Sequence, residues 1–257
     1  MEVSRLYLKP VPTSLSHLFL RFPLIVAPIV IALFLLAPGQ EKMPEAIVTI
    51  CFDDGYRSTY EIAYPILKQY GYPATLFVIP KAVGEEGYMT LNQLRILSNN
   101  GWEIGSHTYS HQKLTTLPAS EVERELKRSK EWLEERGLKV YSFAYPYGAY
   151  NESVIEKVKK YYSVARIGEG IFNNLPLRKD EIYKIKALDV NAPFIKSIDD
   201  LKKIIDQAKV EKKWLVLIFH RVGEKETETE YNVSPQFLEE TVKYLKQLGF
   251  KGVRIEF

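Results

Sequence analysis

Cysteine and histidine are both scarce in this sequence. It has 257 residues but a single cysteine, Cys51, so no disulfide can form within the chain. One cysteine also cannot show whether the protein works in an oxidising or a reducing compartment. There are four histidines, and so few of them make each position informative. Apolar residues make up 46% and charged residues 26%, a balance typical of an ordered globular protein.

A large net charge is lacking as well. The formal net charge is +3, and Arg5, Lys9 and Arg21 against Glu2 place a surplus of two in residues 1–39. The rest of the chain is left with +1. A body so close to neutral excludes the basic footprint of a nucleic-acid-binding protein, so we expect no nucleic-acid partner. The length is typical of one α/β barrel domain.

No apolar run is as long as a standard membrane-spanning helix. Residues 22–40 carry no charged side chain, but the continuous apolar core covers only residues 24–37. A spanning helix needs about 20 apolar residues, a length reached here only if residues 18–20 are included. Pro23 and Pro28 weaken a helix further. The alternative interpretation is a buried helix of the folded domain.

The charges that precede this segment indicate its orientation. Arg5, Lys9 and Arg21 lie before it, and retention of positive residues inside implies that the rest of the chain crosses the membrane. We therefore interpret residues 1–43 as a signal-anchor that holds an extracytoplasmic domain at the membrane. The alternative is a signal peptide cleaved near Gly39, which would release a secreted protein.

Residues 44–257 are predicted to form one α/β domain. Apolar runs predict strands at residues 46–52, 74–79, 102–105, 140–144, 163–166, 182–187, 214–219 and 252–257. Amphipathic stretches predict helices at residues 58–70, 91–99, 121–136, 152–161, 198–209 and 235–248. Alternating strands and helices favour a parallel sheet with helical crossovers, whose active site lies at the carboxyl ends of the strands.

Two adjacent carboxylates end the first predicted strand. Asp53 and Asp54 follow the apolar run directly, and such groups are costly to bury unless they bind something. Successive strand residues point to opposite faces, but Gly55 allows a sharp turn that brings both carboxylates into one site. The alternative is an Asp-Asp-Gly turn that caps the following helix.

Three histidines lie in residues 44–257, and all of them follow predicted strands. His107 and His111 come after the strand at 102–105, and His220 comes after the strand at 214–219. Two histidines four apart can bind one ion if the segment is a single helical turn, with one carboxylate as the third ligand. The alternatives are a pair of surface histidines and, for His220, a structural residue of the core.

Four motifs occur in the order found in one known family. They are Phe52-Asp53-Asp54-Gly55, His107-x-x-x-His111, Tyr145-Pro146-Tyr147-Gly148 and Ile218-Phe219-His220. Over residues 44–257 the chain resembles the polysaccharide deacetylases with a NodB homology domain (carbohydrate esterase family 4). The resemblance implies a distorted, incomplete (β/α) barrel and one divalent ion, zinc or else cobalt, nickel or manganese. It also implies an acetylated glycan substrate.

The resemblance assigns roles to individual side chains. Asp54, His107 and His111 would bind the metal ion, Asp53 would be the general base and His220 the general acid. Each assignment carries over from the matching motif position.

Further assignments concern the substrate side of the site. The Tyr147 N–H, after Pro146, would stabilise the oxyanion, and Asp189 would orient the general acid. One position departs from the family, because the arginine that often pairs with the base is replaced by Ala144. Arg166 and Arg221 are candidate substitutes, although we interpret each as an ordinary surface or sheet-edge charge.

The resulting functional hypothesis is a metal-dependent hydrolase that removes acetyl groups from cell-surface or extracellular polysaccharide. Two alternatives remain. One is a cyclic amide or imide hydrolase on the same fold. The other is a non-catalytic glycan-binding envelope protein with a degenerate site.

Overall fold

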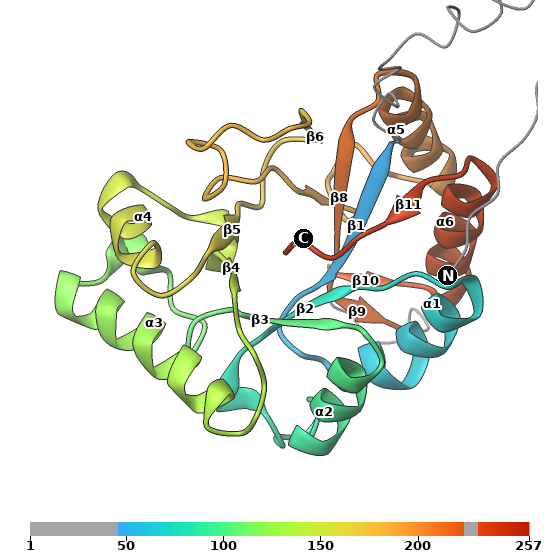
Figure 1. Cartoon of the computed structure of the whole chain (residues 1–257). Helices are drawn as coiled ribbons and strands as arrows, with labels where there is room; N and C mark the ends of the chain where they lie inside the picture. Colours follow the sequence, from blue (N-terminus) through green and yellow to red (C-terminus); the bar gives the residue numbers. More distant parts are fainter. Residues whose placement is uncertain (1–45, 224–230, 257) are drawn as a thin grey trace, which may run out of the picture. The chain divides into compact units, whose positions relative to one another are not determined.

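The computed structural model describes residues 46–223 and 231–256, which fold around one curled, mainly parallel sheet (Figure 1). The strand order is β5-β4-β3-β2-β1-β8; β11 also pairs with β1, and β6 and β7 pair with β8. The strands are β1 (Ile47–Phe52), β2 (Thr75–Val78), β3 (Glu103–Ser106), β4 (Ser142–Ala144), β5 (Val164–Arg166), β6 (Phe172–Asn173), β7 (Leu188–Asp189), β8 (Trp214–Phe219) and β11 (Lys251–Gly252). This is the distorted, incomplete (β/α) barrel that the sequence predicted.

Helices cover the outside of the sheet (Figure 1). The described α-helices are α1 (Tyr64–Tyr70), α2 (Leu91–Asn99), α3 (Ala119–Glu134), α4 (Glu152–Val158), α5 (Ile198–Val210) and α6 (Pro235–Gln247). All six were predicted, but the first begins as a π-helix at Thr59–Ala63. Pro65 follows at the start of α1 and has no N–H to continue a regular helical ladder.

Strand side chains alternate between two apolar cores, because successive residues of a strand point to opposite faces. Leu215 and Leu217 of β8 pack in an outer core with the helices. Val216 and Ile218 of the same strand belong to an inner core on the concave side of the sheet. The inner core therefore lies on the same face of the sheet as the inward-pointing side chains at the carboxyl ends of the strands.

The segment that links the two open edges of the sheet differs from the prediction. Residues 182–187 were predicted as a strand, but pairing there is limited to one isolated bridge between Ile185 and Arg166. The chain then changes partner, and Leu188 in β7 pairs with Leu217 of β8. A continuous strand cannot form because this short segment has to contact β5 first and β8 afterwards.

The predicted strand at residues 252–257 is also shorter than expected. Regular pairing stops at Gly252, and side chains bind the backbone beyond it. The Ile255 N–H donates to Thr75 Oγ1 at 3.0 Å, and the Glu256 N–H donates to the buried carboxylate of Glu103 at 3.1 Å. These bonds tie the carboxyl-terminal segment to the amino ends of β2 and β3.

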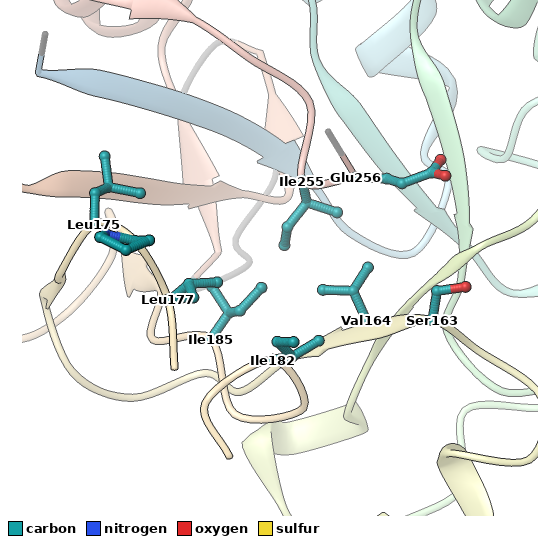
Figure 2. A pocket seen from close by; sticks show the side chains of 9 residues that line it. Ser163, Val164, Leu175, Leu177, Ile182, Ile185, Ile255 and Glu256 are labelled. Carbon is teal, nitrogen blue, oxygen red and sulfur yellow. The ribbon is translucent and has the colours of Figure 1, made fainter. Parts of the chain in front are cut away.

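An apolar cavity of about 650 Å³ lies at this amino-terminal end of the strands. Figure 2 shows Leu175, Leu177, Ile182, Ile185 and Ile255 around a common space. The cavity also borders the residue before β5, so it is remote from the carboxyl ends of the strands, where the sequence placed the active site.

No helix within residues 46–223 and 231–256 has both the length and the apolar character needed to cross a bilayer. The anchor or signal peptide predicted over residues 1–43, with its alternative cleavage near Gly39, lies outside the described residues.

Candidate active site

Four strands bring polar side chains together on the inner face of the sheet. Asp53, His107 and His220 follow β1, β3 and β8 directly, and Arg166 ends β5. Asp53 comes two residues after Cys51 of the inner core, so strand alternation carries its side chain to the same face. Because these strands are parallel, their carboxyl ends meet at one edge.

A sharp turn adds Asp54 to this group. Asp54 has a φ of +70° and Gly55 a φ of +85°, left-handed conformations that aspartate tolerates better than most residues and glycine adopts freely. The turn places Asp54 Oδ1 3.7 Å from His107 Nε2 and 3.4 Å from His111 Nε2. The sequence attributed this turn to the glycine, whereas Asp54 itself also adopts the unusual conformation.

The histidine pair lies on an irregular turn, and the single helical turn considered from the spacing is wrong. Thr108 and His111 have φ values of +60° and +61°, which a right-handed helix does not allow. The His111 N–H donates to Thr108 Oγ1 at 3.0 Å. The N–H and hydroxyl of Ser110 each donate to the carboxylate of Glu125 on α3 at 2.8 Å. Helix α3 thus supports the turn.

His107 is held in one orientation by the neighbouring strand. Its Nδ1 lies 2.8 Å from the carbonyl oxygen of Ala144, which requires a proton on Nδ1 and leaves the Nε2 lone pair facing the carboxylates. Burial lowers the pKa of His107 to about 4, although Asp53 and Asp54 act in the opposite direction. A neutral imidazole with a free Nε2 is the form that binds a metal ion.

The three predicted ligands fit a zinc-like ion. One atom from each of Asp54, His107 and His111 lies within 4.8 Å of the other two. Ligand atoms around a tetrahedral zinc ion are roughly 3.3 Å apart, close to the shorter separation found here. Asp54 Oδ1 is buried and has no hydrogen-bond partner among the described residues. An unpaired buried carboxylate oxygen beside two imidazole nitrogens indicates a cation site.

Asp53 pairs with Arg166, and the interpretation of this arginine as a surface or sheet-edge charge is wrong. Arg166 Nη2 donates to Asp53 Oδ1, and both side chains are buried. Burial raises the pKa of Asp53, but the charge and hydrogen bond of Arg166 act in the opposite direction, and the pKa is lowered to about 2. Asp53 is therefore a carboxylate at neutral pH, as a general base requires.

Strand register explains how Arg166 replaces the family arginine. Ala144 of β4 pairs directly with Arg166 of β5, so the two positions lie at the same level of the sheet. The other candidate, Arg221, instead places its guanidinium carbon 4.1 Å from the centre of the Tyr56 ring. Arg166 therefore pairs with Asp53 from β5, whereas the resemblance placed that arginine at position 144 of β4.

The proposed acid also lies beside Asp53, near the carboxylate oxygen that His107 approaches. His220 Nε2 is 3.9 Å from Asp53 Oδ2, and its ring is 5.0 Å from the ring of Tyr231. Asp189 borders the same cavity, but its Oδ1 accepts hydrogen bonds from Asn191. His220 Nδ1 is buried with no hydrogen-bond partner in the described chain. The orienting role of Asp189 stays a prediction.

These groups line a cavity of about 390 Å³. Tyr147 has 68% of its surface exposed, a φ of +59°, and a ring 4.7 Å from that of His111. Pro146 is buried and begins the short turn that presents it. Tyr56 and Tyr231 also line the cavity and were not identified from the sequence. Tyr56 lies two residues after Asp54, which could have indicated it; no motif marks Tyr231.

A curled parallel sheet with polar side chains clustered at the carboxyl ends of its strands is typical of the α/β-barrel class of enzymes. Within that class, residues 40–163 match the family model described as polysaccharide deacetylase. The matched region contains the first three of the four motifs, and the family is the one that their order predicted.

Individual relatives agree with this assignment. The polysaccharide deacetylase homologue YxkH of Bacillus subtilis is 37% identical over 47% of this chain and 44% of its own length. The poly-β-1,6-N-acetyl-D-glucosamine N-deacetylase of Staphylococcus aureus is 35% identical over 49% of each chain. The matched region is thus about half the length of these curated relatives.

Solved structures extend the likeness in fold over most of the chain. The Xyl-CE4 domain of a multidomain xylanase from the hindgut metagenome of Trinervitermes trinervoides has a TM-score of 0.60 and 23% identity, covering 82% of this chain and 87% of that one. A CE4 family pseudoenzyme from Bacillus anthracis also has a TM-score of 0.60, with 18% identity over 82% of this chain and 64% of that one. At these identities the likeness concerns the fold alone.

Proposed function

We propose that the protein is a metal-dependent deacetylase that hydrolyses N-acetyl groups on a cell-surface or extracellular polysaccharide. The observation that carries the proposal is the convergence of Asp53, Asp54, His107, His111 and His220 at one edge of the sheet. This set contains a base, a metal site and a candidate acid. The family match supports the same chemistry.

The residues divide the work of amide hydrolysis between them. A divalent ion held by Asp54, His107 and His111 would polarise the acetyl carbonyl and make an attacking water more acidic. Asp53, kept ionised beside Arg166, would accept the proton of that water, a contribution of about 10²–10⁴-fold.

The remaining groups act on the oxyanion and the leaving group. The N–H of Tyr147 would stabilise the oxyanion, and one such donor is worth about 3–4 kcal/mol. His220 Nε2 lies 3.9 Å from Asp53 Oδ2, and His220 would donate a proton to the departing amine. The products would be acetate and a free amino sugar. Zinc suits the one-oxygen, two-nitrogen ligand set best, with cobalt, nickel and manganese as alternatives.

Acetate release from a panel of glycans tests the proposal. The panel contains chitin oligomers, peptidoglycan fragments, poly-N-acetylglucosamine and acetyl-xylan. Ring opening of a cyclic imide is measured separately to test the rival hydrolase. We expect acetate from at least one N-acetylated glycan with the zinc-loaded protein and none with Asp53→Asn. Glycan binding with bound metal but no acetate would instead support the non-catalytic alternative.

The cellular location is a separate proposal that rests on residues 1–43. Their positive charges followed by an apolar stretch support an extracytoplasmic domain held at the membrane. Fractionation of the producing cells, with the amino terminus of the mature protein determined by mass spectrometry, separates the two forms. A membrane-bound chain that retains residue 1 indicates an anchor, and a soluble chain starting near residue 40 indicates cleavage.

A further inference from the structure

The active-site cavity continues past the metal ligands. A second cavity of about 310 Å³ shares Asp54, Tyr56 and His111 with the first. Its other lining residues are Ile79, Lys81, Ala82, Tyr88 and Ser110. If the acetyl group of one sugar reaches the metal ligands, the adjoining sugar of the polymer would lie in this second cavity.

The wall of the second cavity is fixed relative to the metal ligands on both sides. Tyr88 forms an antiparallel bridge with Tyr56, two residues after Asp54, and their rings stack at 5.1 Å with an angle of 26°. The Lys81 N–H donates to the carbonyl of Tyr109 at 3.0 Å, two residues before His111. These contacts therefore fix the second cavity relative to the metal ligands, and so relative to an acetyl group bound at them.

This wall combines an aromatic surface with one unpaired positive charge. Tyr56 and Tyr88 are half-buried, and such rings offer flat apolar faces with polar edges. The exposed side chain of Lys81 forms no ion pair with any described carboxylate. Glu85 and Glu86 of the same loop are exposed and line neither cavity. Among the described residues, Lys81 is thus the one charged side chain besides the candidate metal ligands that borders this cavity.

The geometry points to a second sugar subsite that selects an acidic neighbour. In it, Tyr56 and Tyr88 pack against the sugar adjoining the acetylated one, and Lys81 pairs with a carboxylate on that sugar. The inference rests on the proposed deacetylase function and narrows its substrate class to N-acetylated glycans with a carboxylate on the adjoining residue. A neighbour that has already been deacetylated carries a positive charge and is disfavoured at the same place.

Kinetics on a matched pair of substrates tests this subsite. The pair is an N-acetylated tetrasaccharide with carboxylates on alternate sugars and the same tetrasaccharide with each carboxylate converted to an amide. We expect the ratio of kcat/KM, carboxylate over amide, to fall about 3–10-fold in Lys81→Ala and further in Lys81→Glu, whereas Lys81→Arg retains most of it. The wild-type ratio should also fall with added salt, since a partly exposed ion pair is screened.

Lys113→Ala is the matched control, because Lys113 is an exposed lysine two residues after His111 that borders neither cavity. Its ratio should equal that of the wild type, and metal content should be unchanged in every lysine variant. A wild-type ratio near one, or an equal fall in Lys81→Ala and Lys113→Ala, overturns the assignment of Lys81.

A binding measurement separates this inference from the deacetylase proposal. Asp53→Asn protein, loaded with zinc, is titrated calorimetrically with both tetrasaccharides, with and without Lys81→Ala. Tighter binding of the carboxylate form that is lost with Lys81→Ala supports the subsite even if the wild type releases no acetate, in which case only the proposed reaction fails. Equal binding of the two tetrasaccharides overturns the subsite, even where acetate is released.

Discussion

Asp53 and Asp54 are neighbours in the chain but contact different groups. Asp53 pairs with Arg166, whereas Asp54 Oδ1 faces two imidazole nitrogens and has no hydrogen-bond partner in the part of the chain that the structure describes. We expect Asp53→Asn to retain the metal ion and to lose at least about 10²-fold in kcat, as removal of a general base does. Asp54→Asn should lose the ion itself. Metal analysis beside acetate release distinguishes the two, and equal metal loss in both variants would contradict this division.

His220 is predicted to act on the leaving group. If it donates the proton to the amine, His220→Ala should lose more rate on an N-acetyl substrate than on an aryl acetate ester, whose phenolate leaves unprotonated. The expected difference is on the order of 10²-fold, with unchanged metal content. Similar losses on the two substrates would return His220 to a structural role.

The role of Arg166 as the partner of Asp53 can be tested by moving the arginine from β5 to β4. Arg166→Ala leaves the Asp53 carboxylate buried without its partner, a change that costs about 3–5 kcal/mol in comparable buried pairs. Since Ala144 pairs with Arg166 across β4 and β5, Ala144→Arg in the same chain should restore part of both stability and kcat/KM. Thermal unfolding and acetate release measure the two effects. If the double variant recovers neither stability nor activity, an arginine at the paired position of β4 cannot replace Arg166 as the partner of Asp53.

At this scale the sequence proposed most of the candidate site but left the partner of the base open between Arg166 and Arg221. The candidate ligands and base lie at or shortly after the carboxyl ends of strands, so local pattern was enough to propose them. The contact between Asp53 and Arg166 depends on four intervening strand pairings, β1 to β2, β3, β4 and β5. That register cannot be derived from the residues around either position.

Among the helices, α3 has a direct connection to the metal site. Its Glu125 is 8% exposed and accepts two hydrogen bonds from Ser110, next to His111. We expect Glu125→Ala to weaken metal affinity about 10–100-fold, because outer hydrogen bonds orient metal ligands. Isothermal titration with zinc measures this change.

Glu131→Ala is the control, because Glu131 lies on the same helix but faces solvent with an ion pair to Lys127. Its effect on zinc affinity should be negligible. A comparable loss of zinc affinity in both variants would mean that helix stability, not the bond to the turn, matters.

Element prediction succeeded where a segment keeps at least one neighbour along its whole length, as β8 does with β1. The range of β8 and that of α2 coincide with the predicted ones, 214–219 and 91–99. It failed at residues 182–187, which change partner. It also failed at the turn from His107 to His111, where two left-handed residues and the hydrogen bonds that Ser110 donates to Glu125 of α3 override the four-residue spacing. Both failures come from contacts with distant parts of the chain.

At the scale of the whole molecule, the curled sheet brings the inward-pointing side chains of several strands together in one site. Each strand sends every second side chain into the inner core, and the same parity continues to Asp53, His107 and His220. The sequence predicted the parallel alternation and the edge that carries the chemistry. It could not predict the second cavity or the apolar one at the opposite end, since both depend on how loops close over the sheet.

Two carboxylates and two imidazoles lie close together in this fold, and the last prediction concerns how an ion bound among them would change its stability. Asp53, Asp54 and His107 are all nearly fully buried, and an ion that binds only the folded state stabilises it by mass action. At a free zinc concentration 100 times the dissociation constant, the gain is about 2.7 kcal/mol. For a domain of this size, that raises Tm by about 5–10 °C.

Differential scanning calorimetry of the full chain, with zinc and after chelation, measures this shift. His111→Ala and Asp54→Asn should show little or no shift, because each lacks one of the three ligands found within 4.8 Å of one another. Asp53→Asn should keep most of it, since Asp53 is bound to Arg166 and not assigned to the ion. The same shift in all three variants would place the stabilising ion elsewhere in the chain and separate it from the catalytic groups.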